Sequence, residues 1–186
     1  MGLYDVEIKN ELKNFLDLTP LEMNYTEIKD IYDELKSGLM VEVYAPDIIR
    51  KLEAIICAPL EVKNSLLAQY IIELNKNILA STSIIDFSNK IASSILYWIS
   101  KSTHYSIEEA LSCVYKTYLV KNQRYGDSWF KHGDLGICRD MGRKMLRLVN
   151  VENSGDDMTN TFLDIIDYCA FMNVYQKYIR IKKEEQ

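Results

Sequence analysis

Apolar residues recur along this chain with the period of an α-helix. In residues 84–101 they fall three or four positions apart, which places them on one helix face: Ile84, Phe87, Ile91, Ile95 and Trp98. Similar spacing, with Pro and Gly at the ends, predicts helices over residues 4–16, about 20–36, 46–58 and 60–79. Gly38 is typical of a helix stop, and the weak alternation of residues 41–44 is typical of a short extended segment.

Three more helices are predicted in the C-terminal part. The first covers residues 106–120 and opens with Ser106 and Glu109, which match a capping box. The second covers residues 135–149. Its apolar stripe is Ile137, Cys138, Met141, Met145 and Leu148, and its far side carries Arg139, Arg143 and Arg147.

The last predicted helix covers residues 156–181 and has two contrasting faces. We expect one face to be buried: Met158, Phe162, Ile165, Cys169 and Met172. The opposite face carries Asp156, Asn160, Asp164 and Asp167. The pattern therefore predicts a basic ridge on one helix and an acidic ridge on the next.

Composition agrees with a helical fold. Only 7 Gly and 3 Pro occur in 186 residues, too few for a fold with many tight turns, and 48% of the residues are hydrophobic. We predict an all-α helical bundle, with residues 1–100 forming an N-terminal helical region packed on residues 101–186. No apolar run is long enough to span a membrane and no signal peptide is evident, so we expect a cytoplasmic protein with four buried free cysteines.

Charge is unevenly distributed along the chain. The net charge is −5, yet residues 116–147 contain eight basic and only three acidic residues. An acidic surface as a whole repels a long polyanion, which argues against binding of long nucleic acids. A local basic segment still suits a small anion.

The segment 121–129 places polar, aromatic and basic residues around Gly126, between two predicted helices. Arginine side chains and loop amides bind phosphate oxygens well, and an aromatic ring covers a base or sugar. The predicted nucleotide- or phosphate-binding residues are Lys121, Asn122, Arg124, Tyr125, Gly126, Ser128, Trp129, Arg139, Arg143, Lys144 and Arg147.

Structural roles explain the same residues. Lys121 and Asn122 suit a helix end, Gly126 suits a tight turn, and Trp129 suits a packing anchor. The basic and acidic ridges could also meet as salt bridges between packed helices.

Taken in order, these motifs resemble the nucleotide modification-associated domain, type one, a phage and bacterial family. The resemblance covers residues 105–178 and rests on Lys-Asn-x-x-Tyr-Gly-Asp-Ser-Trp, Gly-Ile, Lys-x-x-Arg-Leu and Asn160–Tyr168. It implies an all-helical fold akin to MazG-like nucleotide pyrophosphohydrolases, in which carboxylates on several helices hold Mg²⁺ against a nucleoside triphosphate. It also implies a homo-oligomer.

The chain departs from that family pattern at three positions. Arg124, Arg143 and Asn160 stand where the family usually has acids, leaving Asp127, Asp156 and Asp164 as the Mg²⁺ ligands that the resemblance implies. We therefore expect a protein that binds a nucleotide or other phosphate-bearing small molecule at a reduced metal site and sequesters or senses it. The alternatives are a Mg²⁺-dependent nucleoside triphosphate pyrophosphohydrolase and a helical protein–protein interaction module.

Overall fold

The structure is a computed structural model that describes residues 33, 36–37, 39–40, 42–125, 128–150 and 155–186. Every regular element in these ranges is a helix, which confirms the all-α prediction. The elements are α3 (Pro46–Ile56), α4 (Leu60–Ile78), α5 (Ile84–Ser102), α6 (Ile107–Tyr125), the short 3₁₀ helix η1 (Ser128–His132), α7 (Gly133–Asn150) and α8 (Gly155–Glu184).

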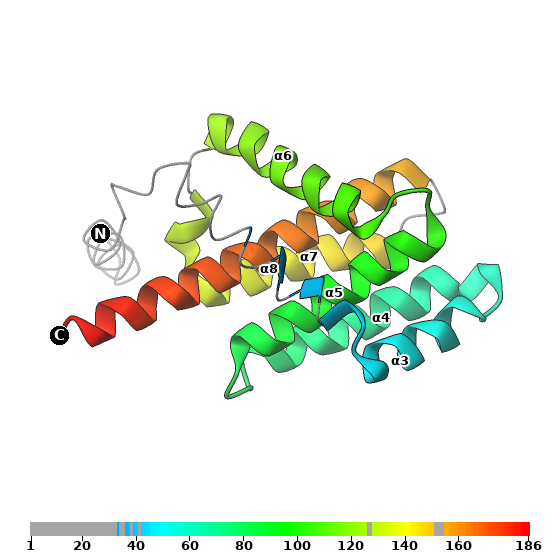
Figure 1. The fold of residues 1–186 in the computed structure, drawn as a ribbon, viewed down its shortest axis with the longest axis horizontal. Coiled ribbons are helices and arrows are strands. Elements are labelled where there is room, and N and C mark those ends of the chain that lie inside the picture. The colour runs from blue at the N-terminus through cyan, green and yellow to red at the C-terminus, as the bar shows by residue number, and fades with distance from the viewer. Residues whose placement is uncertain (1–32, 34–35, 38, 41, 126–127, 151–154) are drawn as a thin grey trace, which may run out of the picture.

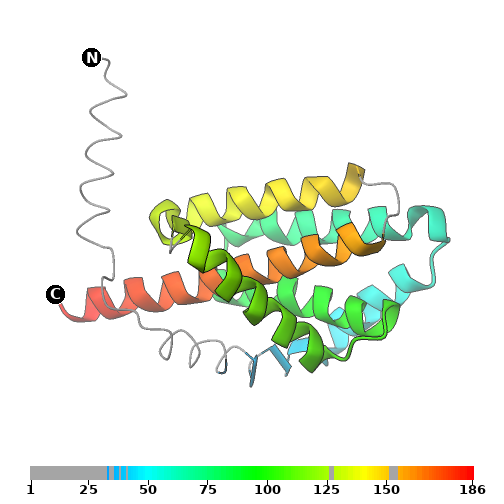
Figure 2. The same cartoon turned by 90° about the horizontal axis from the view of Figure 1, so that it is seen from above.

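Four helices form the body of the bundle. Helices α4, α5, α7 and α8 lie side by side with their axes nearly aligned, while α6 crosses α8 obliquely and α3 covers α4 and α5 (Figures 1 and 2). None of the helices in the described ranges is long and apolar enough to cross a membrane.

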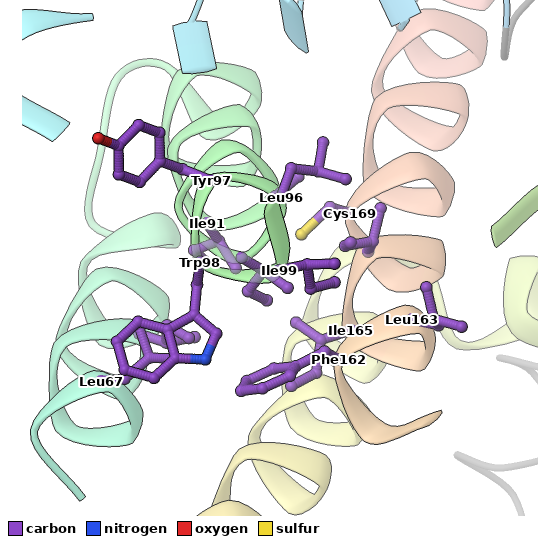
Figure 3. Packing of buried hydrophobic residues seen from close by; sticks show 14 of the residues in the cluster. Leu67, Ile91, Leu96, Tyr97, Trp98, Ile99, Phe162, Leu163, Ile165 and Cys169 are labelled. Carbon is purple, nitrogen blue, oxygen red and sulfur yellow. The ribbon is translucent and has the colours of Figure 1, made fainter. Parts of the chain in front are cut away.

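A hydrophobic core joins described residues from both halves of the chain. It runs from Leu39 to Met172 and includes the predicted apolar stripes of α7 and α8, all of which are buried. In Figure 3, Phe162, Ile165 and Cys169 of α8 point toward α5. Close packing of such side chains is the main favourable contribution to folding.

A few polar contacts set the register between the packed helices. The buried Ser88 hydroxyl of α5 donates to the Cys169 carbonyl oxygen of α8 at 3.0 Å, and the Asn173 amide of α8 donates to Asn89 Oδ1 at 3.1 Å. The Asn75 amide of α4 donates to the Cys138 carbonyl oxygen of α7 at 3.2 Å. Because a buried polar group without a partner costs free energy, sliding one helix along another would be unfavourable.

The capping box at the start of α6 is confirmed. The Ser106 backbone N–H donates to Glu109 Oε2 at 2.7 Å, and the Glu109 N–H donates to Ser106 Oγ at 3.2 Å. The bond from the Ser106 backbone N–H, together with a hydrogen bond from the Ser106 side chain, stabilises the carboxylate and holds the pKa of Glu109 below its usual value.

Several local predictions are wrong. Helix α6 continues through Tyr125, five residues beyond its predicted end, and residues 42–43 are helical and Tyr44 lies in a turn, so no extended segment forms there. Helical residues 39–40 and 42–43 also follow the predicted stop at Gly38.

Some burial predictions also differ from the structure. Asp167 is predicted to lie on the acidic face of the last helix, but it is only 3% exposed, because its position on α8 faces the interior of the bundle. The cysteines are free thiols, but only Cys138 and Cys169 are buried, whereas Cys57 is exposed and Cys113 is half-buried. The predicted helix over residues 4–16 lies outside the described residues.

The surroundings of two glycines of α7 predict opposite effects of a glycine-to-alanine substitution. At Gly142 an added Cβ would lie 3.5 Å from Asn75 Nδ2, an ordinary contact, so Gly142→Ala should stabilise the protein by about 0.5–1 kcal/mol through helix propensity. At Gly136 it would overlap His132 Cβ, so Gly136→Ala should destabilise by about 1–3 kcal/mol. Urea denaturation of both variants measures this difference, and equal effects would contradict the packing of η1 on α7.

Candidate functional site

Charged side chains from three helices meet at one carboxylate. Lys144 Nζ of α7 lies 2.5 Å from Asp164 Oδ2 of α8, and Lys121 Nζ of α6 contacts Asp164 Oδ1. The side chains of Lys121, Lys144 and Asp164 are 46%, 24% and 12% exposed, so the pair with Lys144 is the more shielded. Each Asp164 oxygen therefore accepts from a different helix.

Helix α7 carries a second carboxylate, Asp140, which acts with Asp164 on the nearby Tyr168. Asp140 Oδ1 accepts from Arg143 Nη2 and lies 3.9 Å from Arg139 Nε, while both arginine side chains are largely exposed. We call Lys121, Asp140, Arg143, Lys144 and Asp164 the α6–α8 charge cluster. It contains three cations and two carboxylates, a net charge of +1.

The arginine ridge makes no ion pair with α8 among the side chains that the structure describes. Arg139, Arg143 and Arg147 are exposed, as expected from their spacing, and the ion pairs of Arg139 and Arg143 are with Asp140 of their own helix. The neighbouring residue Lys144 makes that contact, because one position along a helix turns the side chain by about 100°. The salt bridges between helices thus exist, but with lysines in place of the arginines.

Tyr168 lies within the field of both carboxylates. Burial raises the pKa of Tyr168 above its ordinary value of 10.0, and Asp140 and Asp164 raise it further, whereas Arg143 lowers it. The phenol is therefore neutral over the whole physiological pH range and is available as a hydrogen-bond donor.

Trp129 packs against α8. Its ring stacks on Phe171 with centroids 4.4 Å apart and an interplanar angle of 9°, and the buried indole Nε1 has no hydrogen-bond partner among the described residues. The adjacent Phe130 is buried and makes edge contacts with Tyr175 and Tyr178. These contacts support the packing role for Trp129, and a ligand-binding role for this residue stays a prediction.

For most of the other predicted ligand residues in the segment 121–129, the structure describes the backbone alone. Asn122, Arg124 and Tyr125 belong to the last turn of α6 and Ser128 begins η1, so the segment is mostly helical rather than an open loop. Gly126 and Asp127 lie outside the described residues.

The structure places the predicted Mg²⁺ ligands only in part. Asp156 is in the first turn of α8, its side chain is not described, and Asp164 has both oxygens engaged by lysines. Among the described side chains, no three His, Cys, Asp or Glu residues gather in an arrangement that could hold a metal ion. The set Asp127, Asp156 and Asp164 stays a prediction.

A pocket of about 760 Å³ lies one helical turn from the charge cluster. It is formed by the end of α5, the connection to α6, and the facing sides of α6 and α8. His104, Lys116, Thr117 and Asn160 contribute polar groups to it. Sequence reasoning did not predict this pocket. The sequence held one indication of it. Thr117 precedes Lys121 by four residues and Asn160 precedes Asp164 by four residues, so each lies on the same helix face as a residue of the charge cluster.

Comparison with known proteins does not assign a family. A scan against protein-family models, a search of curated proteins and a search of solved structures each found no match. The resemblance to the nucleotide modification-associated domain, type one, therefore stays a prediction, as does the homo-oligomer that it implies.

Removing the shared carboxylate should destabilise the bundle. Asp164→Asn leaves Lys121 and Lys144 without their anionic partner in a partly shielded position, so the free energy of unfolding should fall by about 1–2 kcal/mol. Asp140→Asn is the matched control, because its arginine partners are exposed and its loss should cost less than about 1 kcal/mol. Urea denaturation at low salt compares the two, and a larger loss for Asp140→Asn would contradict this ranking.

The raised pKa of Tyr168 makes a prediction for alkaline pH. The folded state favours the neutral phenol, so this contribution to stability is complete below pH 10 and is lost as the pH rises through the folded-state pKa. Difference absorbance titration against Tyr168→Phe isolates this residue among the tyrosines. Asp164→Asn should lower the Tyr168 pKa and Arg143→Gln should raise it, and an unchanged pKa in both variants would show that desolvation alone determines it.

Proposed function

We propose that this protein binds a nucleotide or other phosphate-bearing small molecule at the α6–α8 charge cluster. The observation that supports the proposal is the convergence of Lys121 and Lys144, from two different helices, on the single carboxylate of Asp164. The cluster has a net positive charge although the whole chain has a net charge of −5. A local positive potential of this kind attracts a small anion without attracting a long polyanion.

The two lysines differ in how readily each can leave Asp164 to bind a ligand. Lys121 is the more exposed, so its ammonium group can turn from Asp164 toward a ligand phosphate, while Lys144 continues to neutralise the carboxylate. Arg143, which pairs with Asp140, is largely exposed, and its guanidinium group offers a planar fork that suits phosphate oxygens. The proposal is limited to binding, because both oxygens of Asp164 accept from lysines in this arrangement.

A ligand screen with matched variants tests this proposal. We expect nucleoside mono- and triphosphates to raise the melting temperature, by roughly 5–10 °C at about 100 times the Kd. Lys121→Met and Arg143→Gln should each weaken binding about tenfold or more in calorimetric titrations, because each removes a charge-assisted hydrogen bond.

Lys51→Met is the control for that screen, because Lys51 lies on α3, on the far side of the bundle from α6 (Figure 1). It should bind as the parent protein does. Absence of any shift with nucleotides and inorganic polyphosphates at low salt would refute the proposal. Equal losses in the Lys51 and Lys121 variants would show that the attraction is only that of overall charge.

A further inference from the structure

The pocket beside the charge cluster has the size of a small-molecule site. Its volume of about 760 Å³ falls within the range of known ligand pockets, roughly 300–1,000 Å³. The buried side chains of Ile99, Ala110 and Leu163 form its apolar part. Such a lining favours a ligand with a flat or apolar body.

The polar part of the lining selects the charge of the ligand. None of the described residues that line the pocket is acidic, although the chain contains 27 Asp and Glu residues, and Lys116 supplies a cation. Thr117 and Asn160 supply hydroxyl and amide groups that donate and accept hydrogen bonds. The pocket therefore suits a polar heterocycle that is attached to an anion.

An aromatic pair belongs to the same lining. The rings of His104 and Tyr105 stack on each other with centroids 4.5 Å apart, and both residues line the pocket. An aromatic face of this kind can stack on any nucleobase, because every base has a π-face.

The pocket and the charge cluster are connected through two helices. On α6, Thr117 precedes Lys121 by four residues, and on α8, Asn160 precedes Asp164 by four residues. Four residues correspond to about one helical turn, roughly 6 Å along each axis. A single small molecule can thus reach from the pocket to Lys121.

We propose that the pocket holds the nucleoside part of a nucleotide whose phosphate group lies at the α6–α8 charge cluster. This inference rests on the proposed function and adds a second, separate subsite to it. The base lies against His104 and Tyr105 over the apolar part, Thr117 and Asn160 bind polar groups of the base or sugar, and the phosphate extends along α6 and α8 toward Lys121.

Cys113 provides a direct readout of occupancy, because it lines the pocket and is half-buried. In a Cys57→Ser background it is the thiol to label with iodoacetamide, since Cys138 and Cys169 are buried and burial raises the pKa of each to about 12. We expect AMP, GMP, CMP or dTMP, whichever binds, to slow labelling about tenfold at roughly ten times its Kd. Tripolyphosphate, which occupies only the charge cluster, should leave the rate unchanged.

The outcomes separate this inference from the proposed function. A nucleotide that raises the melting temperature but leaves Cys113 labelling unchanged overturns the pocket assignment and leaves phosphate binding intact. Nucleosides that protect Cys113 when no phosphate compound raises the melting temperature support the pocket and refute the charge cluster. If neither nucleotides nor nucleosides protect Cys113, the pocket assignment is wrong.

Filling the pocket provides a second test. Thr117→Phe fills volume that the base would occupy in the pocket, so nucleotide affinity should fall about tenfold or more while tripolyphosphate affinity stays the same. Asn160→Tyr, at an exposed position on α8, should give the same result without altering the core. Ser112→Phe, on the exposed side of α6, is the matched control and should bind both compounds normally. Equal affinities in all three variants would overturn the inference.

Discussion

Helix α8 packs against α5 on one side and α7 on another, and these two contacts determine where the remaining elements can lie. Ile165 and Met172 are completely buried in them, and the Ser88 hydroxyl bonds to an α8 carbonyl at the same interface. Helix α6 and η1 then cover a further part of α8. Because α8 is in contact with most of the bundle, its partly exposed positions lie in the seams between helices. The half-buried Asp164 occupies such a position, and the exposed Asn160 precedes it by four residues.

The helices could be predicted where burial follows the helical period. The apolar stripes of α7 and α8 are buried as the spacing of Ile137, Met141 and Met145 or of Phe162, Ile165 and Cys169 indicates. Helix ends were harder to predict, because Lys and Asn are acceptable both inside a helix and near its end. Local composition around Gly126 suggested a loop from Lys121 onward, yet α6 extends to Tyr125.

The partners within the site could not be predicted from charge alone. The spacing of Arg139, Arg143 and Arg147 correctly indicates one face of α7, but the angle between α7 and α8 decides which face is opposite Asp164. Lys144 faces it, and Asp140 binds the arginines of its own helix. The pocket is a product of the oblique crossing of α6, which no local pattern encodes. Its residues were visible in the sequence only as isolated polar positions.

The carboxylate shared by two lysines explains how a structural ion pair can also release one lysine to a ligand. A fully buried carboxylate that loses its only cation costs about 3–5 kcal/mol, which would make any ligand that removed the cation bind weakly. Asp164 has two cationic partners, and the more shielded of them, Lys144, remains if Lys121 turns away. The penalty for releasing Lys121 is then closer to that of a surface ion pair, about 0–1 kcal/mol. A phosphate that gains Lys121 therefore retains most of the free energy of that contact.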